Sequence, residues 1–390
     1  MKNTKAVLSI IVISQFCCTS LWFAGNGVMA DLIADFHLAP SALGHLTAAV
    51  QFGFITGTLL YALLTLADRF PPSRVFFISA LLAALFNLGT ILENNTMASL
   101  LSFRFLTGFF LAGIYPVGMK IAADYYQKGL GTALGFLVGA LVLGTAFPHL
   151  LKDLTLAFPW RLVIIATTSI AVVGGVLMLL LVPNGPYRSP STTSDFKAWL
   201  SVFKNKNFRA AAFGYFGHMW ELYAFWAFVP VILNTYVQLH PETQFNIPLL
   251  SFMIIGFGGL ACVISGYVSQ TLGTKKTAAF ALTVSGLCCL LSPLIFYMDS
   301  SVFCVGFLIL WGLAVIADSP LFSTLVAQNA PAKTKGTALT IVNCIGFAIT
   351  IVSIQLISSI SGVINPRYIY MILAIGPALG LLALLKKKVT

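Results

Sequence analysis

Charged side chains are the scarcest feature of this 390-residue sequence, because Asp, Glu, Lys and Arg together make up 8% of it. A soluble protein normally carries about a quarter of such residues. Hydrophobic residues make up 58%, and the mean hydropathy is +0.94. This apolar surplus is too large for one buried core, so most of it must face lipid. The composition excludes an ordinary soluble domain and predicts a polytopic membrane protein in a lipid bilayer.

Metal-ligand clusters, disulfide patterns and phosphate loops are also missing. The five histidines are scattered, at His37, His45, His149, His218 and His240. The cysteines lie in apolar runs without metal-ligand spacing, at Cys17, Cys18, Cys262, Cys288, Cys289, Cys304 and Cys344. We therefore expect no metal site, no disulfide and no cofactor. Because there is no Gly-Lys-Ser or Gly-Lys-Thr loop and no nucleophile with a partner base, we expect neither an ATP-driven pump nor an enzyme.

Long apolar runs are the main positive feature of the chain. Runs of about 20 residues, bounded by charged or turn residues, predict membrane spans. The first run is too long for a cleaved signal peptide, so we predict that it is a span. Twelve spans are predicted, at residues 6–30, 42–65, 75–92, 97–123, 129–151, 160–183, 209–238, 248–270, 277–297, 301–326, 336–360 and 368–385. The sequence thus predicts an all-α polytopic fold with twelve transmembrane helices.

The net charge of the chain is +11, and the basic residues behind it are distributed as the predicted topology requires. If the N-terminus lies inside, most lysines and arginines fall in cytoplasmic loops, and the other side receives only Lys152, Arg161 and Arg367. This asymmetry is the positive-inside pattern, and it predicts that both termini are cytoplasmic. The basic charge therefore indicates topology and contact with anionic lipid, and we expect no nucleic-acid partner.

A linker at residues 184–208 divides the chain almost in half. It separates an N-terminal bundle, 1–183, from a C-terminal bundle, 209–390, each with six predicted spans. After a Pro/Ser/Thr-rich start, apolar residues recur at helical spacing between lysines, at Phe196, Trp199, Leu200 and Phe203. This spacing predicts an amphipathic helix on the cytoplasmic membrane face.

The two halves repeat one another. "GTAL" occurs at 131–134 and again at 336–339, and three further pairs lie 204 residues apart: Gly108 with Gly312, Pro116 with Pro320, and Trp22 with Trp226. Two parallel six-helix bundles with a cavity between them are an architecture of transporters.

The loop after the second span, "LTLADRFPPSRVF", resembles the cytoplasmic signature of the major facilitator superfamily, Gly-x-Leu-Ala-Asp-Arg-x-Gly-Arg-Lys. Leu66, Ala67, Asp68 and Arg69 match it, whereas Leu64 and Pro71 replace its glycines and Arg74 lies one place beyond its basic pair. The equivalent loop of the second half, "GYVSQTLGTKK", keeps Gly266, Gly273 and Lys275. The resemblance implies that Asp68 helps to close the cytoplasmic side near the eleventh helix, in a gate with Arg69, Arg74, Gly266 and Lys275.

The fourth span is similar to a second motif of this superfamily, in which an arginine lies four residues before a glycine, here Arg104 and Gly108. The sequence departs from two subfamilies of the superfamily, which narrows the range of subfamilies that it resembles. No proline follows Gly139, so the signature of drug/proton antiporters is incomplete, and the second span has Gln51 where nitrate transporters carry an arginine. The resemblance implies a monomeric secondary transporter of the bacterial inner membrane that works by alternating access.

Three charged residues lie well inside predicted spans: Arg104, Glu221 and Asp318. A charge at the bilayer centre costs about 3 kcal/mol or more and usually faces a cavity or a partner. Glu221 lies near the midplane, with His218 one turn away on the same face. Because carboxyl and imidazole groups bind and release protons, this pair predicts proton coupling, with H⁺ as the coupling ion. The alternative is a His–Glu hydrogen bond that fixes the seventh helix.

We expect Arg104 to bind a substrate carboxylate or to form an ion pair with Glu221. The alternative is that it donates hydrogen bonds to backbone carbonyls of the first helix. Its repeat-related position is Leu308, so the charge is asymmetric. Asp318 precedes Ser319 and Pro320, which favours a gating or structural duty over substrate contact.

Polar and aromatic residues inside spans give further candidates. Asn26 lies between Gly25 and Gly27 and one turn from Trp22, which indicates either a loosened helix that contacts substrate or close helix packing. The other cavity candidates are Gln51, Tyr115, Trp226, Trp311 and Asn343.

These features predict a proton-coupled symporter that imports a small polar or anionic organic solute. The alternative is an exporter of amphipathic compounds, which the aromatic content of 13% allows. A channel would need neither two repeat halves nor loop charges that close one side.

Overall fold

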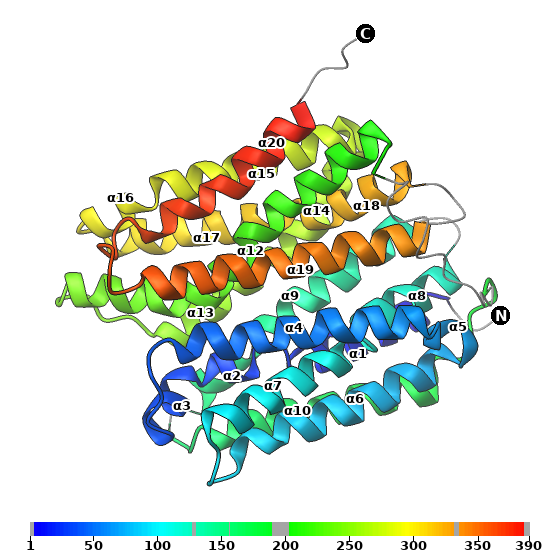
Figure 1. Ribbon diagram of the computed structural model, residues 1–390, viewed down its shortest axis with the longest axis horizontal. Coiled ribbons are helices and arrows are strands. Elements are labelled where there is room, and N and C mark those ends of the chain that lie inside the picture. The colour runs from blue at the N-terminus through cyan, green and yellow to red at the C-terminus, as the bar shows by residue number, and fades with distance from the viewer. Residues whose placement is uncertain (1–3, 127–129, 156, 189–202, 331–334, 386–390) are drawn as a thin grey trace. The chain divides into compact units, whose positions relative to one another are not determined.

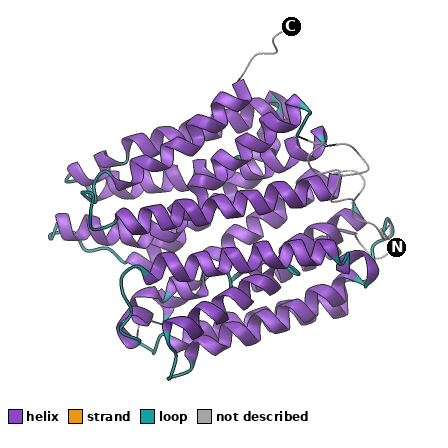
Figure 2. Ribbon diagram, in the orientation of Figure 1, coloured by secondary structure: helices purple, strands orange, loops and turns teal. Residues whose placement is uncertain are grey.

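The computed structural model is helical almost throughout, which confirms the predicted all-α polytopic fold (Figure 2). It describes every residue except 1–3, 127–129, 156, 189–202, 331–334 and 386–390. The chain forms two compact units, Met1–Ser194 and Asp195–Thr390. Of the predicted amphipathic helix, residues Phe196, Trp199 and Leu200 lie outside the described part.

Unit 1 is built from the helices drawn in blue to green in Figure 1. Their bounds are α1 Thr4–Thr19, α2 Ala24–Gly27, α3 Met29–Asp35, α4 Ala42–Leu63, α5 Leu66–Arg69, α6 Pro72–Leu88, the 3₁₀ helix η1 Gly89–Ile91, α7 Met97–Leu111, α8 Tyr115–Tyr125, α9 Leu130–Leu154 and α10 Arg161–Leu181. Within this unit α7 packs on α4, α10 on α6, and α1 on both α9 and α10.

Unit 2 is arranged around one long helix, α12, Lys206–Leu239, which packs on α18, α19 and α20. The remaining bounds are α13 Ile247–Gly256, α14 Gly258–Leu272, α15 Thr274–Leu291, α16 Pro293–Tyr297, α17 Ser301–Ala317, α18 Ser319–Asn329, α19 Lys335–Ile360, the 3₁₀ helix η4 Ile369–Ala374 and α20 Ile375–Leu385.

Ten helical segments of the described chain are long and apolar enough to cross a membrane. They correspond to the second through eleventh predicted spans. The first and twelfth spans contain shorter apolar helices, Ala6–Thr19 and Ile369–Leu385. The first ends where the chain turns after Thr19, before α2, and the last consists of the 3₁₀ helix η4 followed by α20.

Matching breaks divide one span in each unit. The span that holds α7 and α8 turns at residues 112–114, just before Pro116, and the span that holds α17 and α18 turns at Asp318, just before Pro320. Proline removes a backbone donor and so interrupts the helical ladder. The two breaks lie at the repeat-related prolines.

The repeat also appears in how helices touch. A Cβ atom added to Gly108 on α7 would collide with the carbonyl oxygen of Val50 on α4. One added to Gly312 on α17 would collide with the carbonyl oxygen of Ile254 on α13. Each glycine and its contact are displaced by 204 residues, so the same close helix crossing is built twice.

Candidate functional site

Helix α12 carries the two titratable residues that the sequence singled out. Its 34 residues run without a break past Pro230, and both Glu221 and His218 are 1% exposed. Residues three apart on a helix point about 60° from one another, so they can face different neighbours. The structure shows this divergence.

Glu221 is bound by neutral donors from neighbouring helices, among them the Cys289 thiol on α15. The Ser285 hydroxyl on α15 donates to Oε2 at 2.9 Å, and the Trp311 indole on α17 donates to Oε1 at 2.5 Å. The indole is held in turn against the ring of Phe225, at a centroid distance of 4.5 Å. Within the described part of the chain, no Lys, Arg or His lies within ion-pair distance of Glu221. A carboxyl group so placed is neutralised most simply by binding a proton.

His218 contacts Asp318, which corrects the alternative of a His218–Glu221 hydrogen bond. Its Nδ1 lies 2.7 Å from Oδ1 of Asp318, and the two side chains are 1% and 0% exposed. Asp318 reaches the imidazole because it sits at the break between α17 and α18, where the chain turns beside α12. Two acid–base groups thus join α12 to neighbouring helices at separate points.

Arg104 bonds the broken first span of unit 1. Its Nη1 donates to the carbonyl of Leu21 at 3.2 Å, and its Nη2 donates to the carbonyl of Trp22 at 2.5 Å. A third bond runs from Nη1 to Oδ1 of Asn87 on α6, at 3.2 Å. The turn between α1 and α2 leaves these carbonyls outside a regular helical ladder, so a guanidinium with several donors is well suited to bind them. These contacts correspond to the alternative expected for Arg104, in which it bonds backbone carbonyls of the first span.

Three candidates of unit 1 lie together beside this break. Asn26 on α2 donates to the Thr47 hydroxyl on α4 at 2.8 Å, and Gln51 follows Thr47 by one turn. Trp22 packs on Phe54, at a centroid distance of 4.7 Å. The Gln51 side chain is fully buried, and neither amide atom has a hydrogen-bond partner among the described residues. A buried amide without partners is suited to bind a polar ligand or water.

The other cavity candidates lie outside these contacts. Tyr115 is half-buried and opens α8. Trp226 is buried on α12, with its ring 5.3 Å from that of Tyr223. Tyr223 in turn packs on Phe347 of α19, one turn after the half-buried Asn343.

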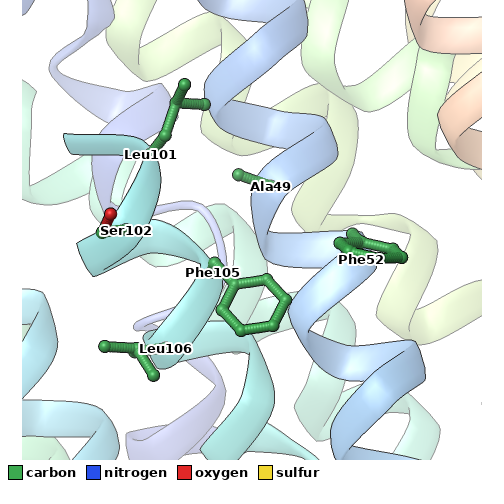
Figure 3. A pocket seen from close by; sticks show the side chains of 6 residues that line it. All are labelled: Ala49, Phe52, Leu101, Ser102, Phe105 and Leu106. Carbon is green, nitrogen blue, oxygen red and sulfur yellow. The ribbon is translucent and has the colours of Figure 1, made fainter. Parts of the chain in front are cut away.

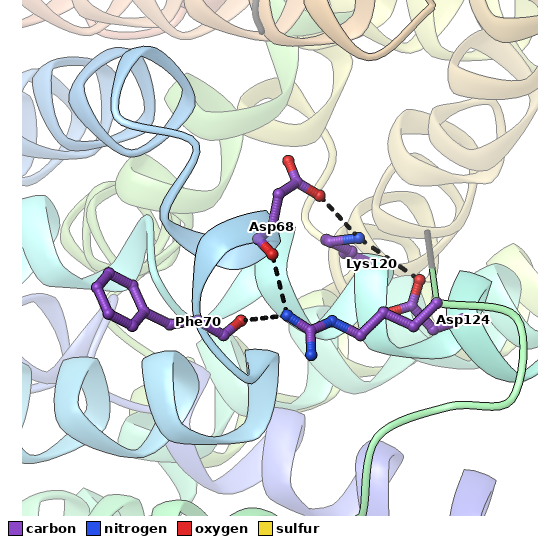
Figure 4. A network of polar contacts seen from close by, with 5 residues as sticks. Asp68, Phe70, Lys120 and Asp124 are labelled. Carbon is purple, nitrogen blue, oxygen red and sulfur yellow. Dashed lines mark hydrogen bonds and ion pairs between the residues drawn. The ribbon is translucent and has the colours of Figure 1, made fainter. Parts of the chain in front are cut away.

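Asp68 belongs to a polar network at one end of unit 1 (Figure 4). Lys120 on α8 lies 3.0 Å from Asp68 and 3.5 Å from Asp124. Arg188 donates to the carbonyls of Asp68 and Phe70, at 2.9 and 3.0 Å. The network thus ties the loop of the second span to α8 and to the start of the linker.

The other predicted gate residues make no such contacts in the described chain. Arg69, Arg74 and Lys275 are exposed, and the space around Gly266 is open. Their gating role stays a prediction.

An apolar groove of about 450 Å³ lies between α4 and α7 (Figure 3). It is lined by Ala49, Phe52, Leu101, Ser102, Phe105 and Leu106. Its one polar side chain, Ser102, bonds the carbonyl of Ala98 in its own helix. The groove therefore offers nothing that would recognise a polar solute.

Sequence reasoning missed two residues that hold the site. Asn87 bonds Arg104 and donates to Thr168 at 3.0 Å, and Ser285 bonds Glu221. Asn87 could have been found as an amide inside an apolar span. Ser285 carries no such signal, because serine is common in membrane helices. No group of three or more His, Cys, Asp or Glu in the described chain could hold a metal ion.

Comparisons with known proteins find one matching family profile and several similar transporters. The profile described as Major Facilitator Superfamily matches residues 11–354. The uncharacterized MFS-type transporter YfhI of Bacillus subtilis (strain 168) is 22% identical over 343 residues, which cover 85% of this chain and 81% of that protein. A probable L-galactonate transporter of Escherichia coli (strain K12) is 22% identical over 179 residues, covering 41% and 39% of the two chains. A solved bacterial homologue of the human lysosomal transporter Spinster, inward-facing and unoccupied, shares the fold with a TM-score of 0.73, 14% identity and 98% coverage of both chains.

Proposed function

Because the chain belongs to the major facilitator superfamily of membrane transporters, we propose that it is a proton-coupled symporter of a small polar organic solute. Transport proceeds by alternating access in the bacterial inner membrane, with both termini cytoplasmic. The observation that carries this proposal is Glu221, which is buried in a membrane span and accepts hydrogen bonds from neutral donors.

Glu221 is the proton carrier in this proposal. Ser285 and Trp311 hold the carboxylate when it is charged, and a proton removes its charge without displacing them. A group that changes charge inside the membrane alters the electrostatic energy of the span that carries it. Proton binding at Glu221 is thereby linked to the conformation of unit 2.

Arg104 has a positioning role in this proposal. Its guanidinium donates hydrogen bonds to two backbone carbonyls and one amide oxygen, and these bonds hold the conformation of the broken first span. Gln51 is one of two groups in unit 1 suited to bind the solute, since its buried amide, like that of Gln15, offers both donors and an acceptor without a partner among the described residues. The E. coli relative, named for a sugar acid, supports keeping organic anions among the candidate solutes.

Uptake into proteoliposomes under an imposed pH gradient tests the proposal. Small organic acids and their neutral analogues are screened with the wild type, and the solute found is tested with Glu221→Gln. We expect the gradient to drive accumulation by the wild type, while the variant retains only exchange. Glu242→Gln is the matched control, because Glu242 is an exposed glutamate of the same unit. Normal accumulation by Glu221→Gln would remove Glu221 as the carrier.

A further inference from the structure

One side of α4 carries a stripe of buried polar and aromatic side chains. Its four members follow one another at spacings of four, three and four residues, which places them on the same side of the helix: Thr47, Gln51, Phe54 and Thr58. Ala49 and Phe52, which line the apolar groove, lie on the opposite side (Figure 3). The stripe faces the broken first span, since Asn26 of α2 bonds Thr47 and Trp22 packs on Phe54.

Two members of this stripe have no hydrogen-bond partner among the described residues. Both amide atoms of Gln51 and the hydroxyl of Thr58 are buried and unpaired there. A threonine inside a membrane helix can bond a carbonyl of its own preceding turn, as Thr47 and Thr56 do here, at 2.7 and 3.0 Å. Gln15, another amide without a described partner, lies on α1 and outside this stripe. An unpaired buried polar group costs free energy, so Gln51 and Thr58 are suited to bind a molecule that is not part of the chain.

The stripe is electrically neutral. Among Asp, Glu, Lys, Arg and His, α4 contains one residue, His45, which is exposed. The guanidinium of Arg104 already donates to two carbonyls and one amide oxygen. An amide and a hydroxyl can each donate and accept, so they match a ligand hydroxyl in both roles. A carboxylate can only accept, and it would enter the stripe without a counter-ion, which costs free energy.

Aromatic rings lie between the two unpaired groups. Seven residues separate Gln51 from Thr58, which is about 10 Å along the helix axis. Phe54 lies between them and packs on Trp22, at a centroid distance of 4.7 Å. A polyhydroxylated compound carries hydroxyls along a chain or ring of carbons whose C–H groups are apolar. Such a compound can therefore contact the rings and bond the polar groups at the same time.

We propose that Gln51 and Thr58 recognise the solute, and that the solute is an uncharged polyhydroxylated compound, such as a neutral sugar or a polyol. The Gln51 amide donates to one hydroxyl and accepts from another, and the Thr58 hydroxyl bonds a further one. This inference rests on the proposed function, because it names the solute class of the same transporter. Alternating access exposes the stripe to solution in part of the cycle, when hydroxyls of the solute bond the two unpaired groups.

Thermal unfolding of the purified full-length protein in detergent tests the solute class. The probes are matched pairs that differ by one carboxylate: galactitol with galactonate, galactose with galacturonate, and the corresponding pairs of the glucose and mannose series. A ligand that binds the native state raises the unfolding midpoint. We expect a neutral member to raise it and its acid to leave it unchanged. A shift with acids alone, or no shift with any neutral member, would overturn the solute class.

Two variants test the stripe itself. Gln51→Met and Thr58→Val keep the approximate shape of each side chain and remove its hydrogen bonding. We expect each to bind the neutral compound about three- to tenfold more weakly. Without solute the unfolding midpoint should be unchanged or higher, because no bond within the described chain is lost. Full affinity in either variant would overturn the assignment, and so would a lower midpoint with unchanged affinity.

Thr56→Val is the matched control. Thr56 lies on the same helix, and its hydroxyl bonds carbonyls of its own preceding turn. We expect this variant to bind the neutral compound as the wild type does. Weakening as large as that of Thr58→Val would show that any threonine of α4 affects binding, and would overturn the specific role of the stripe.

Gradient-driven uptake into proteoliposomes separates this inference from the proposed function. A neutral compound that binds through Gln51 and Thr58 but does not accumulate under a pH gradient would contradict the proposed proton coupling and leave the stripe standing. Conversely, a sugar acid that accumulates under the gradient, and does so normally in Gln51→Met, would contradict the stripe and leave the proposed symport standing.

Discussion

At the scale of single residues, the identity of hydrogen-bond partners decides what each buried group can do. Glu221 has neutral donors, so it can change charge without losing an ion-pair partner. Arg104 has three acceptors, so it holds backbone that would otherwise be unsatisfied in the membrane. The same residue type would act differently with other partners.

Trp311→Phe should weaken proton-coupled uptake by about tenfold or more. The change keeps a ring against Phe225 and removes the donor to Glu221, and a hydrogen bond to a charged group contributes about 1.5–3 kcal/mol. Gradient-driven uptake in proteoliposomes measures the loss. Trp220→Phe serves as the control, since that indole donates to the backbone carbonyl of Ile372. Equal loss in both variants would contradict a specific role for the Trp311 donor.

At the scale of helices, breaks and close crossings place the polar groups. The break after α1 presents two carbonyls to Arg104, and the break between α17 and α18 presents Asp318 to His218. The crossings of α7 on α4 and of α17 on α13 need glycine, because any side chain would meet backbone.

Gly312→Ala should lower thermal stability in detergent, whereas Gly306→Ala on the same helix should preserve or raise it. A Cβ atom at Gly312 meets the backbone of Ile254, and overpacking costs about 1–3 kcal/mol. One at Gly306 meets nothing within 4 Å. Alanine there gains up to about 1 kcal/mol of helix propensity. A thermal unfolding series of both variants measures the difference, and equal midpoints would show that the α17–α13 crossing tolerates a side chain.

At the scale of the whole molecule, charge is concentrated in networks at the ends of unit 1. Lys120 joins Asp68 and Asp124 at one end, and at another point Lys152 pairs with Asp31 at 2.8 Å. The central parts of the spans are left to apolar residues and a few buried polar groups. This distribution is what a membrane requires of a protein that crosses it many times.

Cysteines introduced at Lys276 and at Glu242 should report the proposed orientation. Both residues are exposed: Glu242 lies in the loop after α12, and Lys276 lies in the first turn of α15, which opens the next span but one. With cytoplasmic termini, a membrane-impermeant maleimide should label position 242 in intact cells and position 276 only after the membrane is opened. Because most native cysteines are buried, a background correction from the unmodified chain suffices. The reverse pattern of labelling would invert the topology.

The sequence by itself determined the fold class, most span limits and the repeat. Hydropathy over about 20 residues is a local property, so it needs no knowledge of neighbours. The sequence also identified Arg104, Glu221 and Asp318 as buried charges, since a charge inside an apolar run has few other places to go.

Only the tertiary structure decided which groups meet. It paired His218 with Asp318, 100 positions along the chain, and surrounded Glu221 with Ser285 and Trp311. It also placed the Arg104 guanidinium where it donates hydrogen bonds to the carbonyls of Leu21 and Trp22. The physical reason is that these helices are apolar on nearly every face. Their sequences therefore do not encode the rotation about the helix axis that selects a partner, and packing against neighbouring helices sets it.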